Sequence, residues 1–159
     1  MHDNEILGRL ADALSMDGDR LAAIFTLGGE ELTSAEALGR TLKPDVDGGM
    51  ECTPGQVARF LEGFIIEQRG PRTSGQAPPA VASLTNNAVL KKLRIALTLH
   101  EADMLRIFEA GGAPNTPLGL SPLFRKPGNK HYRPCSDRVL RSFLQGLAQL
   151  HQPEASQEE

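Results

Sequence analysis

Arginine and lysine side chains are concentrated in one short stretch of the chain, residues 123–138. The stretch also holds a glycine and a tyrosine, and it leads into an expected helix whose N-terminus attracts negative charge. Guanidinium and ammonium groups donate charge-assisted hydrogen bonds to phosphate oxygens. We therefore predict a surface that binds nucleic acid or another polyanion. Its expected contacts are Arg125, Lys126, Lys130, His131, Tyr132 and Arg133, widened by Lys91, Lys92 and Arg94 on an earlier helix and by Arg141.

The net charge of -3 for the whole chain conceals two halves of opposite sign. Residues 4–69 carry six basic and twelve acidic side chains, a net charge of -6, whereas residues 87–151 carry ten and four, a net charge of +6. The segment that corresponds to the basic stretch, residues 42–52, is acidic. Two interpretations follow. Either the basic surface is free to bind an anion, or the two loops or halves face and neutralise each other.

Few side chains could support catalysis or bind a metal. Cys52 and Cys135 precede expected helices, where the helix dipole could lower a thiol pKa, but small residues at such positions are more often packed than reactive. A disulfide between them is a further alternative that a reducing compartment disfavours. His131 has no accompanying Cys or His pair for zinc, and residues 45–51 lack the ligand order of a calcium loop. We expect no catalytic residues, no metal site and no cofactor, and an enzyme is the least expected class.

The elements that position these side chains belong to a repeated unit. A shift of 83 positions aligns residues 4–63 with residues 87–146 without a gap and gives sixteen identities in sixty positions. About one in sixteen positions would match by chance. The identical pairs are Asn4/Asn87, Leu7/Leu90, Leu10/Leu93, Ala13/Ala96, Leu14/Leu97, Ile24/Ile107, Phe25/Phe108, Gly28/Gly111, Gly29/Gly112, Thr33/Thr116, Lys43/Lys126, Pro44/Pro127, Cys52/Cys135, Phe60/Phe143, Leu61/Leu144 and Gly63/Gly146.

Each copy has the hydrophobic spacing of four helices, with apolar residues three and four positions apart. In the first copy we expect helices over residues 4–15 and 19–27, a short third helix after Thr33 and a fourth that opens at residues 53–56. No segment alternates with the period of a strand, so the predicted fold class is all-α.

Local signals predict where the helices begin and end. Thr33 and Thr53 each precede Glu or Gln by three residues, the pattern of a capping box, and Asp3 is the expected cap of the first helix. Glycines at residues 28–29 are expected to end the second helix. Lys43 and Pro44 are expected to end the third, because proline disfavours helical geometry in the preceding residue.

The sequence predicts a first repeat over residues 1–69, a linker rich in Pro, Gly and Ser over 70–86, a second repeat over 87–151 and a disordered acidic tail over 152–159. A module of about 65 residues buries little surface alone, so we expect the two copies to share one core as a pseudo-symmetric unit. There is no secretory signal pattern and no apolar run long enough to span a membrane. We expect a cytoplasmic, bacterial-type protein without membrane contact.

Two long motifs resemble a known family. The motif LTNN-x-VLKKLRIA begins at Leu84, and the motif LFRKPG-x-K-x-YR-x-C begins at Leu123. In these motifs, and over nearly its whole length, the chain is similar to the YehS-like bacterial proteins. That resemblance implies a duplicated domain of unknown function and supplies no catalytic residues. The chain departs from the family mainly in its linker and its Glu-rich tail.

Two hypotheses from different classes remain open. In the first, the protein is a non-enzymatic helical binding protein that uses the basic surface of the second repeat for nucleic acid or another polyanion. In the second, it is a protein-protein adaptor or self-associating scaffold, with an acidic protein or another copy of itself as partner. The opposite charges of the two repeats would then hold the two copies or two subunits in register. Salt-sensitive association of the separate repeats without nucleic acid would favour the second.

Overall fold

The computed structural model describes residues 1–71 and 84–151, and every regular element in that part of the chain is helical. Most of the expected linker, residues 72–83, and the whole expected tail, residues 152–159, lie outside the described residues. None of the described helices is long and apolar enough to cross a membrane.

The helices divide between the two repeats. The first repeat contains α1 (Asp3–Ala13), α2 (Gly18–Leu27), α3 (Ser34–Gly39) and α4 (Pro54–Arg69). The second contains α5 (Asn86–Ala96), α6 (Glu101–Ala110), α7 (Pro117–Leu120), the 3-10 helix η1 (Ser121–Phe124) and α8 (Asp137–His151).

The predicted capping boxes are confirmed. The backbone N–H of Glu36 donates to the Thr33 hydroxyl at 3.1 Å, and the Glu36 carboxylate accepts from the Thr33 N–H at 2.9 Å. Thr53 and Gln56 repeat this arrangement at the start of α4. These reciprocal bonds satisfy backbone donors that have no partner within the helix.

Three predicted helix boundaries were wrong. Helix α1 begins at Asp3 rather than after it, because His2 is the N-cap and its Nδ1 accepts from the N–H of Asn4 at 3.1 Å. It ends at Ala13, and Ser15 two residues later has a φ of 53°, which a right-handed helix does not allow. Helix α3 ends at Gly39, before Lys43 and Pro44, so proline does not terminate it.

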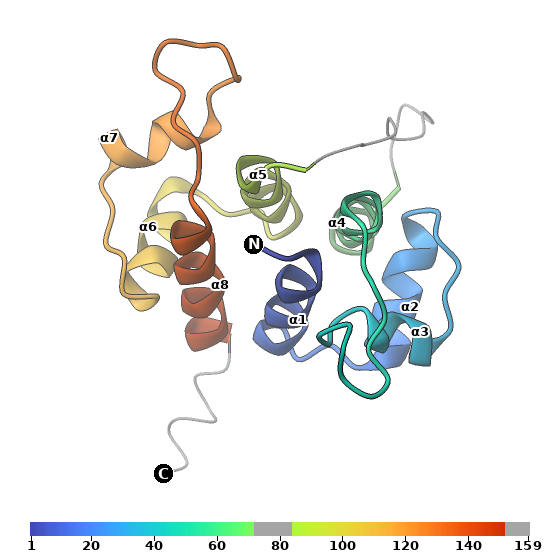
Figure 1. Cartoon of the computed structure of the whole chain (residues 1–159). Helices are drawn as coiled ribbons and strands as arrows, with labels where there is room; N and C mark the ends of the chain where they lie inside the picture. The colour runs from blue at the N-terminus through green and yellow to red at the C-terminus, as the bar shows by residue number, and fades with distance from the viewer. Residues whose placement is uncertain (72–83, 152–159) are drawn as a thin grey trace.

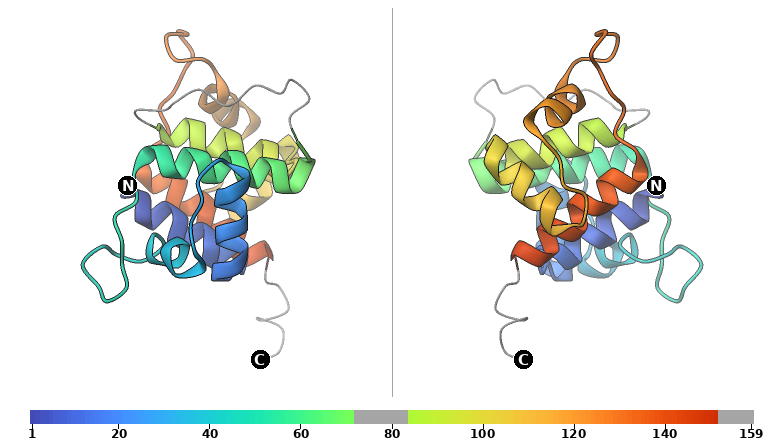
Figure 2. Two further views of the ribbon diagram at one scale, coloured as in Figure 1. Left: turned by 90° about the vertical axis from the view of Figure 1, so that its right-hand side faces the viewer. Right: turned by 90° about the vertical axis from the view of Figure 1, so that its left-hand side faces the viewer.

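The first helix of each repeat packs mainly against the last helix of the other repeat. Helix α1 contacts α8 far more extensively than α4, and α5 contacts α4 far more extensively than α8. Helices α2 and α6 cover the outer faces of α4 and α8 (Figures 1 and 2). The buried side chains of both repeats form one hydrophobic cluster. The structure is therefore a single pseudo-symmetric helical unit, as predicted.

The core repeats with the same pseudo-symmetry. Phe25 and Phe60 are in edge contact with their ring centres 5.1 Å apart in the first repeat, and their equivalents Phe108 and Phe143 are 5.3 Å apart in the second. All four rings are buried. Aromatic pairs at such separations add to the stabilisation that burial alone provides. Two of the sixteen sequence identities, Phe25/Phe108 and Phe60/Phe143, thus mark an aromatic core contact that both repeats share.

Candidate functional site: a basic loop on the second repeat

A closed loop presents the basic residues of the second repeat. The N–H of Arg133 donates to the carbonyl of Pro122 at 3.1 Å and closes the loop at its base. Inside the loop, Asn129 forms two turns, one with the carbonyl of Lys126 at 3.0 Å and one with the N–H of Tyr132 at 2.9 Å. In the first repeat the N–H of Met50 closes the equivalent loop on Gly39 at 2.9 Å. The two loops therefore have one backbone frame and different side chains.

A buried asparagine holds this loop against α5. The Asn87 amide donates to the carbonyls of Leu123 and Arg133, both at 2.9 Å, and its oxygen accepts from the N–H of Cys135 at 2.8 Å. Asn4 makes the same three kinds of contact in the first repeat, to Leu42, Met50 and Cys52. Sequence reasoning missed this anchor, although the Asn4/Asn87 identity was its signal. The anchor fixes the loop without using any basic side chain.

The structure brings most of the predicted contacts together at the protein surface. Arg125, Lys126, Lys130, His131 and Arg133 are exposed, whereas Tyr132, which the sequence suggested was exposed, is partly buried. No ion pair involves the four Lys and Arg side chains among residues 1–71 and 84–151. The Arg133 guanidinium donates to the carbonyl of Gly119 at 3.2 Å, which ties the loop to α7. The positive charge of the loop is accordingly available to an anion.

A cleft of about 530 Å³ lies between this loop and helices α5 and α6. Its wall includes Arg94, Arg125 and Lys126, with one acidic side chain, Glu101. The Arg94 guanidinium lies over the ring of Phe124, 4.8 Å from its centre, and donates to the carbonyl of Leu99 at 3.1 Å. A cation stacked on an aromatic ring keeps its charge while its position is fixed. Arg94 therefore extends the basic surface from the loop onto α5.

The two lysines predicted on α5 have different surroundings. Lys91 is exposed, and helical spacing places it on the face that carries Asn87 and Arg94. Lys92 instead forms an ion pair with Glu62 of α4, a carboxylate that is only 4% exposed. The prediction that Lys92 belongs to the binding surface was wrong, because the packing of α5 on α4 turns it toward the first repeat.

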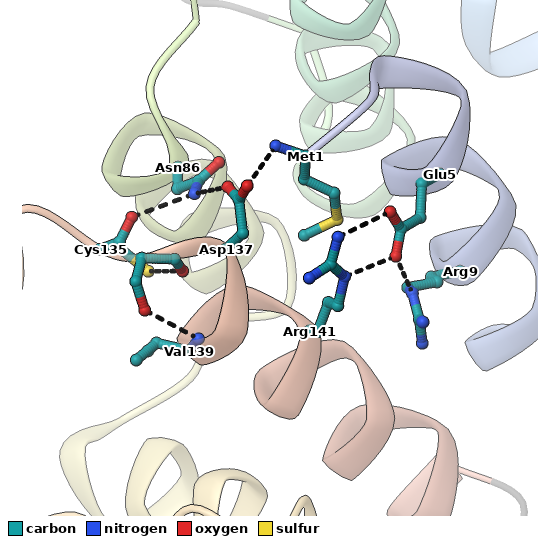
Figure 3. Close-up of polar contacts among 9 residues, drawn as sticks. Met1, Glu5, Arg9, Asn86, Cys135, Asp137, Val139 and Arg141 are labelled. Atoms are coloured by element: carbon teal, nitrogen blue, oxygen red, sulfur yellow. Dashed lines mark hydrogen bonds and ion pairs between the residues drawn. The ribbon is translucent and has the colours of Figure 1, made fainter.

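Arg141 is also paired with the first repeat (Figure 3). Its Nε and Nη2 atoms donate to the two carboxylate oxygens of Glu5 at 2.7 and 3.1 Å, and Arg9 donates to the same carboxylate at 2.7 Å. These bonds, with that to Arg141 the largest cause, lower the pKa of Glu5 from 4.5 to about 2. Nearby, the Met1 ammonium lies 2.6 Å from Asp137. Some of the opposite charges of the two repeats thus form ion pairs that join the repeats.

The two loops do not neutralise each other. Figures 1 and 2 show the basic loop that precedes α8 and the acidic loop that precedes α4 at opposite ends of the molecule. In the acidic loop Lys43, Asp45 and Asp47 are exposed. Of the two arrangements that the sequence left open, the loop-to-loop contact is excluded. Among the described residues, the basic side chains of the second repeat that form ion pairs with the first are Lys92 and Arg141.

Neither cysteine has the environment of a reactive thiol. Cys52 and Cys135 are buried and free, and desolvation raises their pKa values to about 12 and about 11. The structure thus agrees with the packed, unreactive cysteines that the sequence favoured, and not with the alternatives of a dipole-activated thiol or a disulfide. Burial outweighs the field of the following helix. Within the described residues, no group of three or more His, Cys, Asp or Glu side chains could hold a metal ion.

Fold and surface together define a class: an all-helical tandem duplication whose repeats carry opposite charge. The chain belongs to the family described as "Protein of unknown function (DUF1456)", whose model matches residues 3–70 and 86–152. It is 34% identical over 148 residues to "Uncharacterized protein YehS" of Escherichia coli (strain K12), covering 93% of this chain and 95% of that protein. No solved structure matches. The two matched segments coincide with the two repeats and confirm the resemblance that the motifs indicated.

Proposed function

We propose that this protein is a non-enzymatic binding protein that holds nucleic acid, or another polyanion, on the basic surface of its second repeat. The observation that carries the proposal is the set of exposed Lys and Arg side chains on one anchored loop, none with an ion pair among the described residues. The surface consists of Lys91, Arg94, Arg125, Lys126, Lys130 and Arg133. Six cations on a fixed frame suit a row of phosphates better than a single small anion.

The available side chains favour contacts to the phosphate backbone over contacts to bases. Tyr132 is partly buried, and Arg94 covers one face of the Phe124 ring. Base recognition in single strands needs open aromatic faces, and groove reading needs a helix that enters the groove, whereas α7 spans only four residues. Backbone contacts carry no sequence information. Binding should therefore depend strongly on salt and weakly on sequence.

The test compares two equivalent lysines. Lys126→Glu combined with Lys130→Glu should abolish binding to a fluorescent RNA or DNA oligonucleotide, measured by anisotropy at low salt. Lys43→Glu, at the position equivalent to Lys126 in the acidic loop, is the matched control and should leave binding unchanged. For the wild type, each phosphate contact should contribute about -0.9 to the slope of log K against log salt on duplex DNA and about -0.7 on single strands.

Heparin distinguishes nucleic acid from polyanions in general. Equal competition by heparin and by oligonucleotides of unrelated sequence would identify a general polyanion surface. An absence of binding to every polyanion at low salt, or equal loss of binding in the Lys43→Glu control, would contradict the proposal.

The adaptor alternative has its own supporting observation. Exposed apolar side chains gather on the acidic loop of the first repeat, away from the basic surface.

A further inference from the structure

The acidic loop of the first repeat carries four large apolar side chains at its surface. Each is 39–45% exposed; one lies in the last turn of α3, and the other three belong to the loop that the bond from Met50 to Gly39 closes. The four are Leu38, Leu42, Val46 and Met50. At the equivalent positions the second repeat has Ser121, Arg125, Asn129 and Arg133. The same part of the shared frame is thus apolar in one repeat and polar or basic in the other, which is typical of a surface specialised for contact with a protein.

Exposed acidic side chains are interspersed with these apolar residues along the same segment. Asp45, Asp47 and Glu51 are exposed, and Lys43 is the exposed cation within the loop. The carboxylate of Glu51 also contacts His2, whose Nε2 lies 3.4 Å from it. A partner that covers these apolar side chains must therefore present an apolar group with basic side chains beside it.

The second repeat of the same protein presents such a group. Leu118 on α7 is 89% exposed, more than any other large apolar side chain described. It lies beside Gly119, whose carbonyl accepts from the Arg133 guanidinium, so the basic loop borders it directly. An apolar projection with a basic border on one repeat complements an apolar surface with an acidic border on the other.

The two surfaces lie at opposite ends of one molecule and do not meet within it (Figures 1 and 2). From this complementarity we infer that the protein associates with itself head to tail. The Leu118 side of one molecule docks on the surface of Leu38, Leu42, Val46 and Met50 of the next. Such a contact is heterologous, because two different surfaces meet, and repetition gives a ring or an open chain.

This inference goes beyond the proposed function and does not depend on it. Because the Arg133 guanidinium is bound to the carbonyl of Gly119, next to Leu118, a polyanion that engages Arg133 and a second molecule docked on Leu118 exclude each other. A heparin fragment should therefore dissociate the assemblies. Self-association measured without any polyanion tests the inference alone, and oligonucleotide binding by a variant of the apolar surface tests the proposed function alone.

Sedimentation velocity of the full chain, without polyanion, provides the test. The wild type should form larger species as its concentration rises, and high salt should reduce them. Leu118→Ser and Val46→Asp should each raise the dissociation constant at least about tenfold, the effect of losing 1.4 kcal/mol. Both side chains are exposed, so both variants should keep the helical circular dichroism of the wild type. Leu27→Ser, an exposed leucine on neither surface, is the matched control and should associate like the wild type.

A mixture of the two variants separates a heterologous contact from a symmetric one. Each variant keeps one intact surface, so an equimolar mixture of Leu118→Ser and Val46→Asp should form a dimer and nothing larger. A wild type that stays monomeric at every concentration, variants that associate like the wild type, or a mixture without dimers would each overturn the inference.

Discussion

Glu5 lies between two guanidinium groups that belong to different repeats. Arg9 is four residues further along α1, whereas Arg141 belongs to α8 of the second repeat and binds both carboxylate oxygens. A carboxylate held by two cations stays ionised to lower pH, which is why the pKa of Glu5 falls to about 2. A single side chain therefore links the first helix of one repeat to the last helix of the other.

The stability of the protein should depend on the ionisation of Glu5. Its folded pKa of about 2 lies below its ordinary value of 4.5, so the stabilisation is complete above about pH 4.5 and is lost as the pH falls toward 2. Glu5→Gln should lower the free energy of unfolding at pH 7 by about 0.5–1 kcal/mol, the upper part of the range for partly exposed pairs. Urea unfolding followed by circular dichroism at several pH values measures this.

The control for this prediction is Glu31→Gln. Glu31 is exposed and has no ion pair among the described residues, so its replacement should leave stability at pH 7 within about 0.5 kcal/mol of the wild type. Acid unfolding of Glu5→Gln that follows the wild-type curve would show that the pair contributes nothing.

The sequence showed where in the chain the basic side chains cluster, but not which of the neighbouring side chains lie on the same surface. Charge clustering identified the loop, because its four Lys and Arg residues are close neighbours in the chain. It could not separate Lys91 from Lys92, since adjacent helical residues point about 100° apart and only packing decides which one meets Glu62. Leu118 gave no sequence signal either, because an apolar residue in a short helix is ordinarily buried.

At the scale of elements, paired glycines set how closely the outer helices approach. A Cβ on Gly63 would lie 1.9 Å from the carbonyl oxygen of Ile24, and one on Gly146 would lie 1.8 Å from that of Ile107. Gly28 and Gly111 face them with the same lack of space. The helix pairs α2/α4 and α6/α8 thus cross backbone to backbone. This explains the Gly63/Gly146 identity, for which the helical pattern gave no reason, and gives Gly28 and Gly111 a second role beside ending a helix.

Gly146→Ala should destabilise the protein although it places a better helix former in α8. Alanine in place of glycine in a helix ordinarily gains about 0.5–1 kcal/mol, but here the added methyl meets backbone that cannot move without separating α6 from α8. We expect a net loss of about 1–3 kcal/mol, the usual cost of overpacking. Thermal unfolding measures the change. Gln145→Ala, at the exposed neighbouring position, should leave the melting temperature nearly unchanged, and a stabilised Gly146→Ala would contradict the crossing geometry.

The number of helices and the capping boxes of Thr33 and Thr53 could be predicted from the sequence, but the packing partners of the helices could not. Hydrophobic spacing reports which face of a helix is buried, not which neighbour buries it. From the hydrophobic spacing alone, the apolar face of α1 could pack on α4 of its own repeat or on α8 of the other. The structure selects α8, and the inter-repeat pairs of Glu5 and Glu62 are consequences of that choice.

At the scale of the whole molecule, the exchange of first helices means that neither repeat is complete alone. Without its partner each repeat would expose the faces of its first and last helices, which are buried in the intact chain. A unit of about 65 residues has little other core with which to compensate. The interface between the repeats is therefore part of the core.

Cleavage of the connection between the repeats should leave the molecule assembled. With a protease recognition sequence inserted between Pro71 and Leu84, the cut halves should elute together at the size of the intact chain, because cutting removes none of the α1/α8 and α4/α5 contacts or the ion pairs of Glu5 and Glu62. Dilution should eventually separate them, since they lose the high effective concentration that the connection provides. The uncut protein with the same insertion is the control. Halves that separate at once and each remain helical would show two independent domains and refute the exchange of helices.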